Sequence, residues 1–216
     1  MCNKYHFASP IISEGAPLAG SKEEKINSSD ISDAHSLLII REVVPAAQFI
    51  IRGDRGDESF GLSIDQNIKM AFPLEPCTYR YDSKSQLYWL GPDEWLLVSG
   101  SESILERTLR DRLKAPAVIT DVSGGQTVLN LSGALSSIEA VLKKSSVYDF
   151  GAWVDADRGA GRCVRTTFAK ASALIANRSD QSFDVIIRRS FADYLVRWLM
   201  DAGREFGCTF ERYRQP

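Results

Sequence analysis

A carboxylate and a hydroxyl stand directly before a pair of glycines in the second half of the chain. Asp121 and Ser123 precede Gly124 and Gly125. An aspartate beside the exposed backbone N–H groups of a glycine turn has the parts of a general base with an anion-stabilising site. The competing interpretation is that Asp121 accepts hydrogen bonds from the amides of its own turn. The residue types favour this second interpretation, and we predict no catalytic residue here.

Histidine and cysteine chemistry finds little support in the sequence. Both histidines, His6 and His35, fall within the first 36 residues, so the rest of the chain has no imidazole for a Ser-His-Asp or Cys-His mechanism. The four cysteines are dispersed without a C-x-x-C pair, which indicates neither a zinc site nor a disulfide framework. We therefore predict no catalytic set and no metal site.

Residues 91–95, Gly-Pro-Asp-Glu-Trp, form a second polar cluster. A turn leading into an apolar strand would place Trp95 in the core, whereas a tryptophan beside carboxylates is also typical of protein–protein contacts. The two interpretations stay open. On the second, we predict a partner interface that includes Tyr88, Asp93, Glu94 and Trp95.

The charge balance limits the classes of partner. Lys and Arg (26) nearly equal Asp and Glu (28), so there is no basic field for nucleic acid or an anionic membrane. No apolar stretch approaches the roughly 20 residues of a membrane span, and the N-terminus does not resemble a secretory signal. We expect a cytoplasmic protein. Residues 1–36, rich in Ser, Pro, Gly, Glu and Lys without periodicity, predict a flexible N-terminal arm that a partner orders.

The remaining chain alternates strand and helix patterns. Apolar runs between turn residues predict strands at 37–44, 48–52, 78–82, 86–90, 94–99, 117–122, 126–131, 162–168, 171–177 and 183–188. Helical spacing predicts helices at 59–71, 103–113, 135–142 and 190–206, the last capped by Ser190 and ended by Gly207. These patterns predict one α+β domain over 37–216, built from two similar ferredoxin-like lobes, 37–115 and 116–209, that share one core.

Four separated motifs, in order, resemble those of sarcosine oxidase gamma subunits. Residues 90–97 resemble the family's LGPDEWLL signature, and residues 121–133 resemble its DxSxxxxxLxLxG stretch. Residues 166–170 and 189–195 also look like the family. The resemblance covers residues 37–207 and implies an aminomethyltransferase-like folate-binding fold, related to the T-protein of glycine cleavage.

The resemblance also implies a function. The heterotetrameric oxidase demethylates sarcosine to glycine, passes electrons to oxygen, and transfers the one-carbon unit to tetrahydrofolate or releases it as formaldehyde. Its alpha, beta and delta subunits are the implied partners, with FAD, FMN, NAD and tetrahydrofolate expected in alpha and beta and zinc in delta. For this chain, the resemblance implies a structural subunit with no cofactor and no active site of its own.

A departure from the T-proteins bears on two alternatives. Active T-proteins carry an acidic pair where this chain has residues 77–82, and Ser99-Gly100 replaces their Asn-Ala. Independent aminomethyl transfer is therefore disfavoured, but a self-standing folate-binding enzyme or sensor stays open, with Asp82, Asp121 and Ser123 as candidate ligands in a folate-like groove. The other alternative is the equivalent subunit of an N-methylglutamate dehydrogenase, because substrate choice would lie in another chain.

Overall fold

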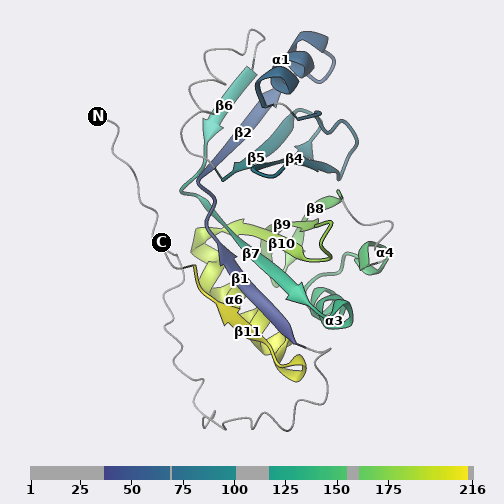
Figure 1. Ribbon diagram of the computed structural model, residues 1–216, viewed down its shortest axis with the longest axis vertical. Helices are drawn as coiled ribbons and strands as arrows, with labels where there is room; N and C mark the ends of the chain where they lie inside the picture. Colours follow the sequence, from purple (N-terminus) through teal and green to yellow (C-terminus); the bar gives the residue numbers. More distant parts are fainter. Residues whose placement is uncertain (1–36, 69, 101–116, 155–160, 214–216) are drawn as a thin grey trace, which may run out of the picture.

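The computed structural model describes residues 37–68, 70–100, 117–154 and 161–213. The N-terminal arm and the helix expected at 103–113 lie outside the described residues. Within the described ranges the strands form a six-stranded and a five-stranded sheet, stacked one above the other (Figure 1). The α+β class predicted from the sequence is confirmed.

The strands of each sheet come from both halves of the sequence. The six-stranded sheet has the order β11 (Thr209–Glu211), β1 (Leu38–Val43), β7 (Gln126–Gly133), β10 (Phe183–Arg188), β9 (Ala171–Asn177) and β8 (Cys163–Phe168). The five-stranded sheet has the order β3 (Tyr79–Tyr81), β4 (Ser85–Gly91), β5 (Glu94–Ser99), β2 (Ala47–Gly53) and β6 (Ala117–Asp121). The strands predicted from apolar runs are therefore present at nearly their expected bounds.

The division into lobes 37–115 and 116–209 is wrong at the level of the sheets. β1 pairs with β7 and β11, so the first strand belongs with the second half of the chain. β6 pairs with β2, so a strand of the second half completes the first sheet. The chain crosses between the sheets twice, from β1 to β2 and from β6 to β7 (Figure 1). Alternating burial identifies a strand but not its sheet, and this is why the pattern assigned both strands to the wrong lobe.

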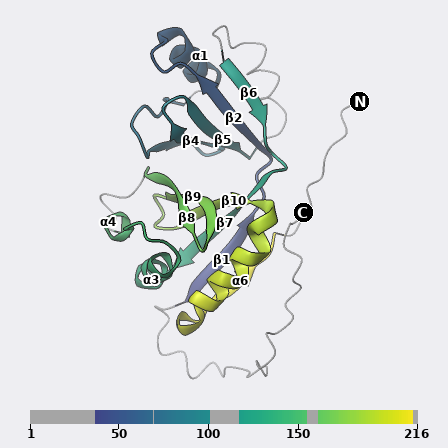
Figure 2. The same ribbon diagram turned by 180° about the vertical axis from the view of Figure 1, so that it is seen from behind.

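Two amphipathic helices cover the outer face of the six-stranded sheet. These are α3 (Leu135–Ser145) and α6 (Ala192–Ala202), and the short α4 (Gly151–Val154) lies beyond α3 (Figure 2). Ile138 and Val141 of α3 and Leu195 and Leu199 of α6 are buried with the strand residues in one apolar cluster. Helical spacing thus aligns the apolar stripe of each helix with the sheet.

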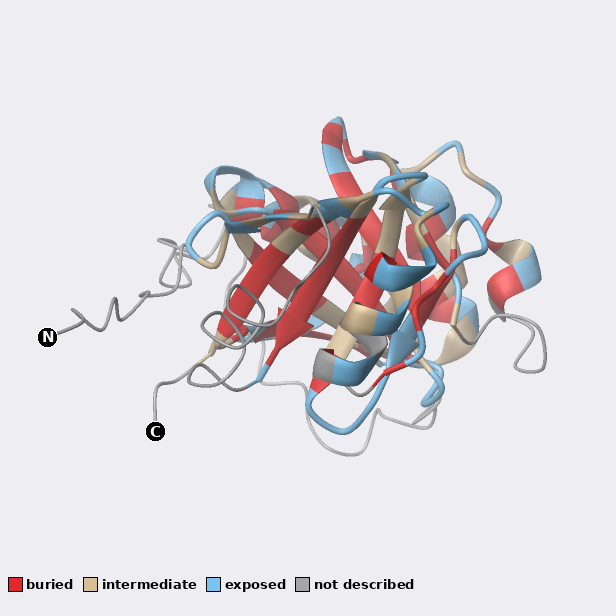
Figure 3. Cartoon of the chain, turned by 90° about the horizontal axis from the view of Figure 1, so that it is seen from above, coloured by how far each residue is buried: buried red, intermediate tan, exposed pale blue. Residues whose placement is uncertain are grey.

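Helix α1 (Glu58–Ile68) lies on the outer face of the five-stranded sheet. Phe60 of α1 packs against Phe72 and Trp95, with ring centroids 5.6 and 5.8 Å away. Figure 3 shows that buried residues concentrate in the strands, while exposed residues lie in loops and on the outward sides of helices. The order of layers is therefore helix, sheet, sheet and helices.

The inner faces of the two sheets share a third apolar cluster. Tyr79, Tyr88 and Leu96 from one sheet pack with Cys163 and Leu174 from the other. At this side the edge strands also approach, because Thr78 and Arg162 form an antiparallel bridge. The bridge is flanked by backbone hydrogen bonds of 2.9 Å, from the N–H groups of residues 79 and 163 to the carbonyls of residues 161 and 77.

The end of the chain differs from the sequence expectation. Ser190 does not cap the last helix: it lies in a 3₁₀ turn, η1 (Arg189–Phe191), and the helix has no side-chain cap hydrogen bond. The helix ends at Ala202, and a second 3₁₀ turn, η2 (Arg204–Phe206), follows. Gly207, at φ 69°, ends that turn in the left-handed conformation and leads into β11.

One glycine permits the close approach of β1 and β7. Gly133 has φ 132°, and a Cβ there would lie 2.0 Å from the carbonyl oxygen of Leu37. No other residue type fits this backbone without moving the strand. The glycine thus holds the first strand against the middle of the six-stranded sheet.

Candidate functional site

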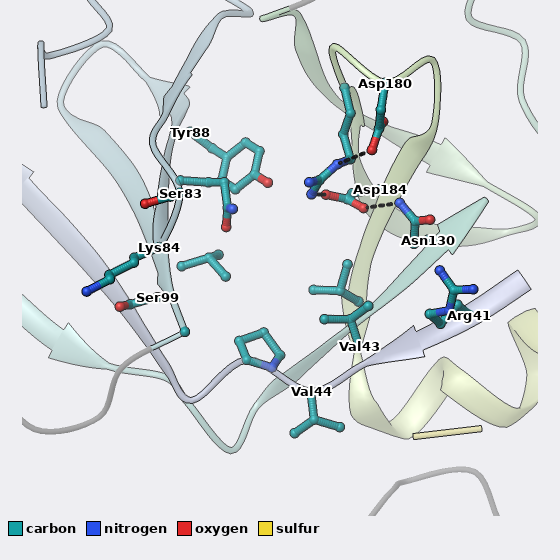
Figure 4. Close-up of a pocket in the computed structure, with 16 residues that line it drawn as sticks. Arg41, Val43, Val44, Ser83, Lys84, Tyr88, Ser99, Asn130, Asp180 and Asp184 are labelled. Carbon is teal, nitrogen blue, oxygen red and sulfur yellow. Dashed lines mark hydrogen bonds and ion pairs between the residues drawn. The ribbon is translucent and has the colours of Figure 1, made fainter. Parts of the chain in front are cut away.

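A cavity of about 600 Å³ opens between the two sheets, on the side of the crossover from β1 to β2. One wall comes from β4 and the end of β5, and the other from β1, β7, β10 and the turn between β9 and β10 (Figure 4). This volume is within the range of small-molecule sites.

A buried ion pair forms the polar part of one wall. The Asp184 carboxylate, 5% exposed, accepts hydrogen bonds from Arg178 Nη1 at 3.0 Å and Asn130 Nδ2 at 2.7 Å. Asn130 also donates to the hydroxyl of Ser182 at 3.0 Å. Both carboxylate oxygens of Asp184 therefore have a partner, as a buried charge requires.

The turn between β9 and β10 fixes Arg178 in place. The backbone N–H of Arg178 donates to the Ser182 carbonyl at 2.8 Å, and Asp180 Oδ1 accepts from the Ser182 hydroxyl at 2.6 Å. Burial would raise the pKa of Asp180, but the bonds from Ser182 and the charge of Arg178 together outweigh it and the pKa is lowered. Burial would likewise lower the pKa of Arg178, but Asp184 outweighs it and the pKa is raised. Both charges are thus maintained at neutral pH.

Tyr88 supplies the opposite wall. Its ring stacks on Tyr79 with centroids 5.0 Å apart, and its side chain is 1% exposed. In Figure 4 its hydroxyl points across the cavity toward Asp184. Burial, and then the charge of Asp184, raise the pKa of Tyr88 well above its ordinary value. The phenol therefore stays protonated and is able to donate a hydrogen bond.

The rest of the lining is mixed. The side chains beside the crossover are apolar: Val43, Val44, Pro45, Val98 and Val128. Polar and charged side chains also contribute: Arg41, Ser83, Lys84, Gln86 and Ser99. Val43 is 39% exposed although it is a strand residue, because it faces this open space. The cavity thus combines a polar end with an apolar end.

The residues predicted for a folate-like groove do not line this cavity. Asp121 Oδ1 accepts from the backbone N–H and the hydroxyl of Ser123, at 2.9 and 2.5 Å, which confirms the structural interpretation of that turn. Ser123 in turn joins the crossover to β2, because its Oγ accepts from the N–H of Gln48 at 2.9 Å. Asp82 Oδ1 accepts from the N–H groups of Lys84 and Ser85 in the β3–β4 turn, both at 2.7 Å. The three side chains thus bond within or beside their own turns and lie outside this cavity, and a folate-like groove that uses them stays a prediction.

The predicted partner interface needs correction. Trp95 is fully buried and donates to the carbonyl of Pro73 at 3.1 Å, and Tyr88 is buried between the sheets. Neither ring offers surface to a partner, because each completes an apolar layer. Asp93 is exposed and Glu94 is half-buried, with its carboxylate 3.2 Å from Arg52, so these two stay predictions.

The sequence reading missed Asn130, Arg178 and Asp184. A signal for one of them was present, since Asp184 interrupts the apolar run of β10 and a carboxylate inside a buried strand needs a partner. The identity of that partner depends on the turn geometry and on the register between β7 and β10, where Asn130 pairs with Asp184.

Within the described ranges, no group of three or more His, Cys, Asp or Glu side chains is placed to hold a metal ion. Among the helices that the structure describes, none combines the length and apolar character that crossing a bilayer requires.

Comparison with known proteins shows the family of the chain. A family model described as sarcosine oxidase, gamma subunit family, matches residues 52–205. The chain belongs to the sarcosine oxidase gamma subunit family. The gamma subunit of sarcosine oxidase from Corynebacterium sp. (strain U-96) is 34% identical over 128 residues, which are 59% of this chain and 60% of that relative. The match therefore spans about three-fifths of the relative's length.

Solved structures extend this family assignment to the fold. A chain of the heterotetrameric sarcosine oxidase from Corynebacterium sp. U-96, in complex with pyrrole 2-carboxylate, superposes with a TM-score of 0.70 at 29% identity. The match covers 80% of this chain and 86% of that one. Glycine cleavage system aminomethyltransferase T from Bartonella henselae superposes with a TM-score of 0.52 at 11% identity, over 82% of this chain and 48% of that one. The second likeness concerns the fold alone.

Proposed function

We propose that this gamma-family chain is a non-catalytic structural subunit of a heterotetrameric sarcosine oxidase. The observation that carries the proposal is the family match over residues 52–205, supported by the superposition on a chain of the solved heterotetramer. The partners are then alpha, beta and delta subunits, and the complex demethylates sarcosine oxidatively to glycine. FAD, FMN, NAD, zinc and tetrahydrofolate belong to the other subunits, and the location is cytoplasmic.

The proposal includes an aminomethyltransferase-like fold with two lobes. The likeness to aminomethyltransferase T supports it at the level of the fold. The two lobes correspond to the two sheets, each completed by a strand from the other half of the sequence. An interleaved pair of sheets suits a scaffold, because two short crossovers of the chain, residues 44–46 and 122–125, join one sheet to the other.

Exposed apolar side chains are candidates for the subunit contacts. Leu62 of α1 is 59% exposed, Val118 of β6 is 61% exposed, and Val147 after α3 is fully exposed. Subunit interfaces bury such side chains, and Asp93 and Glu94 remain proposed contacts at the β4–β5 turn.

Co-expression tests the structural role. The products of neighbouring genes are expressed with and without this chain, and the yield of yellow complex and sarcosine-dependent oxygen uptake are measured. We expect an assembled, active complex only when this chain is present. Full activity and the same assembly without it would contradict the proposal, as would sarcosine oxidation by the chain alone.

The likeness to aminomethyltransferase T also favours testing folate binding by the chain itself. Calorimetric titration of the isolated chain with tetrahydrofolate separates the two candidates. Micromolar binding would support a folate-dependent enzyme or sensor, and absence of heat would support the structural subunit. An N-methylglutamate dehydrogenase subunit is distinguished by assaying the co-expressed complex with both amines.

A further inference from the structure

The hydroxyl of Tyr88 has no hydrogen-bond partner among the described residues, although the side chain is 1% exposed. It points into the cavity from the β4 wall (Figure 4). Because the hydroxyl opens onto the cavity, water can accept its proton in the free protein, and a ligand that accepts from it takes the place of that water. The cavity therefore contains one unused donor at a fixed position.

Arg178 faces the same space from the opposite wall. Of its five N–H groups, one on Nη1 bonds Asp184, and Nε lies 3.7 Å from Asp180 Oδ2. Its side chain is 39% exposed and lines the cavity. Guanidinium N–H groups therefore remain for a second acceptor, and a planar fork of donors suits a carboxylate.

The charged side chains that line the cavity are three cations and two carboxylates: Arg41, Lys84, Arg178, Asp180 and Asp184. Asp184 uses one oxygen for Arg178 and the other for Asn130, at 3.0 and 2.7 Å. Asp180 Oδ1 accepts two bonds from Ser182. The excess of cations over carboxylates in the lining, together with the free N–H groups of Arg178, favours a ligand with an anionic acceptor over an amine.

We propose that the cavity between the sheets binds a small organic carboxylate with an apolar body. One carboxylate oxygen accepts from the Tyr88 hydroxyl and the other from Arg178, so the ligand bridges the two walls. The apolar body lies against Val43, Val98 and Val128 at the other end of the cavity. The site goes beyond a scaffolding role, because it would make the contact between the sheets dependent on a metabolite.

The test uses the full chain and 4-phenylbutyrate as the probe, with 4-phenylbutylamine and 4-phenylbutanol as matched probes of the same body. Binding is measured by calorimetry and by ligand-observed NMR up to about 10 mM, which detects millimolar dissociation constants. We expect saturable binding of the carboxylate and at least tenfold weaker binding of the other two. Absence of saturable carboxylate binding, or equal binding of the amine, would overturn the proposal.

Tyr88→Phe is the decisive variant, because it removes only the hydroxyl and keeps the ring that stacks on Tyr79. We expect its thermal unfolding to be unchanged and its affinity for 4-phenylbutyrate to fall by about tenfold, the effect of one hydrogen bond to a charged group. Arg178→Lys keeps the charge but loses the fork, and it should weaken binding as well. Arg204→Gln breaks an ion pair with Asp201 in which both side chains are more than two-thirds exposed, and it should leave binding unchanged. Wild-type affinity in Tyr88→Phe would show that the probe does not use this site.

Discussion

The space between the two sheets differs between its two sides. Beside the edge strands β3 and β8 it is filled by aromatic and aliphatic side chains, and the Thr78–Arg162 bridge joins the edges. Beside the crossover from β1 to β2 it holds a cavity and the Arg178–Asp184 ion pair. The difference shows that the apolar side holds the sheets together, whereas the polar side satisfies its charges within one sheet and leaves room.

Replacing Leu174 on the filled side tests this comparison with the largest effect. Leu174 is 4% exposed and belongs to the shared apolar cluster. We expect Leu174→Ala to lower the free energy of unfolding by about 3 kcal/mol, or about 1 kcal/mol per carbon removed, because it leaves a void. Urea denaturation followed by fluorescence measures it.

Val98→Ala is the counterpart on the cavity side. Val98 belongs to the same apolar cluster but also lines the cavity, so its removal enlarges an existing space and we expect a cost of about 1 kcal/mol. An equal or larger loss per carbon at Val98 would show that the two sides contribute alike.

Breaking the ion pair tests whether Arg178 and Asp184 stabilise the cavity wall as a coupled pair. Arg178→Gln leaves Asp184 buried with Asn130 as its remaining partner. We expect a loss of about 2 kcal/mol, below the range for fully buried pairs because Arg178 is 39% exposed. Equilibrium unfolding of this variant, Asp184→Asn and the double variant forms a cycle. Additive losses would mean that the pair does not act as a unit.

The buried thiol on the filled side provides a smaller, pH-dependent effect. Burial, and then Cys77, raise the pKa of Cys163 from 9.0 to about 12. The folded state therefore keeps the proton where the unfolded state loses it, so this contribution is complete below pH 9 and is lost as the pH rises toward 12. We expect a loss of about 1 kcal/mol by about pH 10.

Urea unfolding at neutral and alkaline pH, with Cys163→Ala for comparison, measures this loss. The variant should show a flatter dependence of stability on pH. An identical slope in the variant would assign the pH dependence to other groups.

The sequence predicted the local elements better than their partners. β9 and β10 were found because apolar runs flank a polar turn, and the bond from Asp121 to Ser123 followed from residue types alone. β11 was missed because three residues carry no periodicity, and it exists through pairing with β1. The cavity was missed for the same reason, since Tyr88 and Arg178 belong to different sheets and no local pattern relates them.

The pairing of β1 has a consequence for the order of events during synthesis. Ile39 pairs with Ser132 on one side and with Thr209 on the other. The first described strand can therefore pair on both edges only after β11 has been synthesised. While the chain emerges from the ribosome, β2 and β5 can pair early, but the six-stranded sheet stays incomplete and the edges of β1 stay open. We therefore expect nascent chains to depend on chaperones, or on partner subunits made at the same time, until residue 211 has left the exit tunnel.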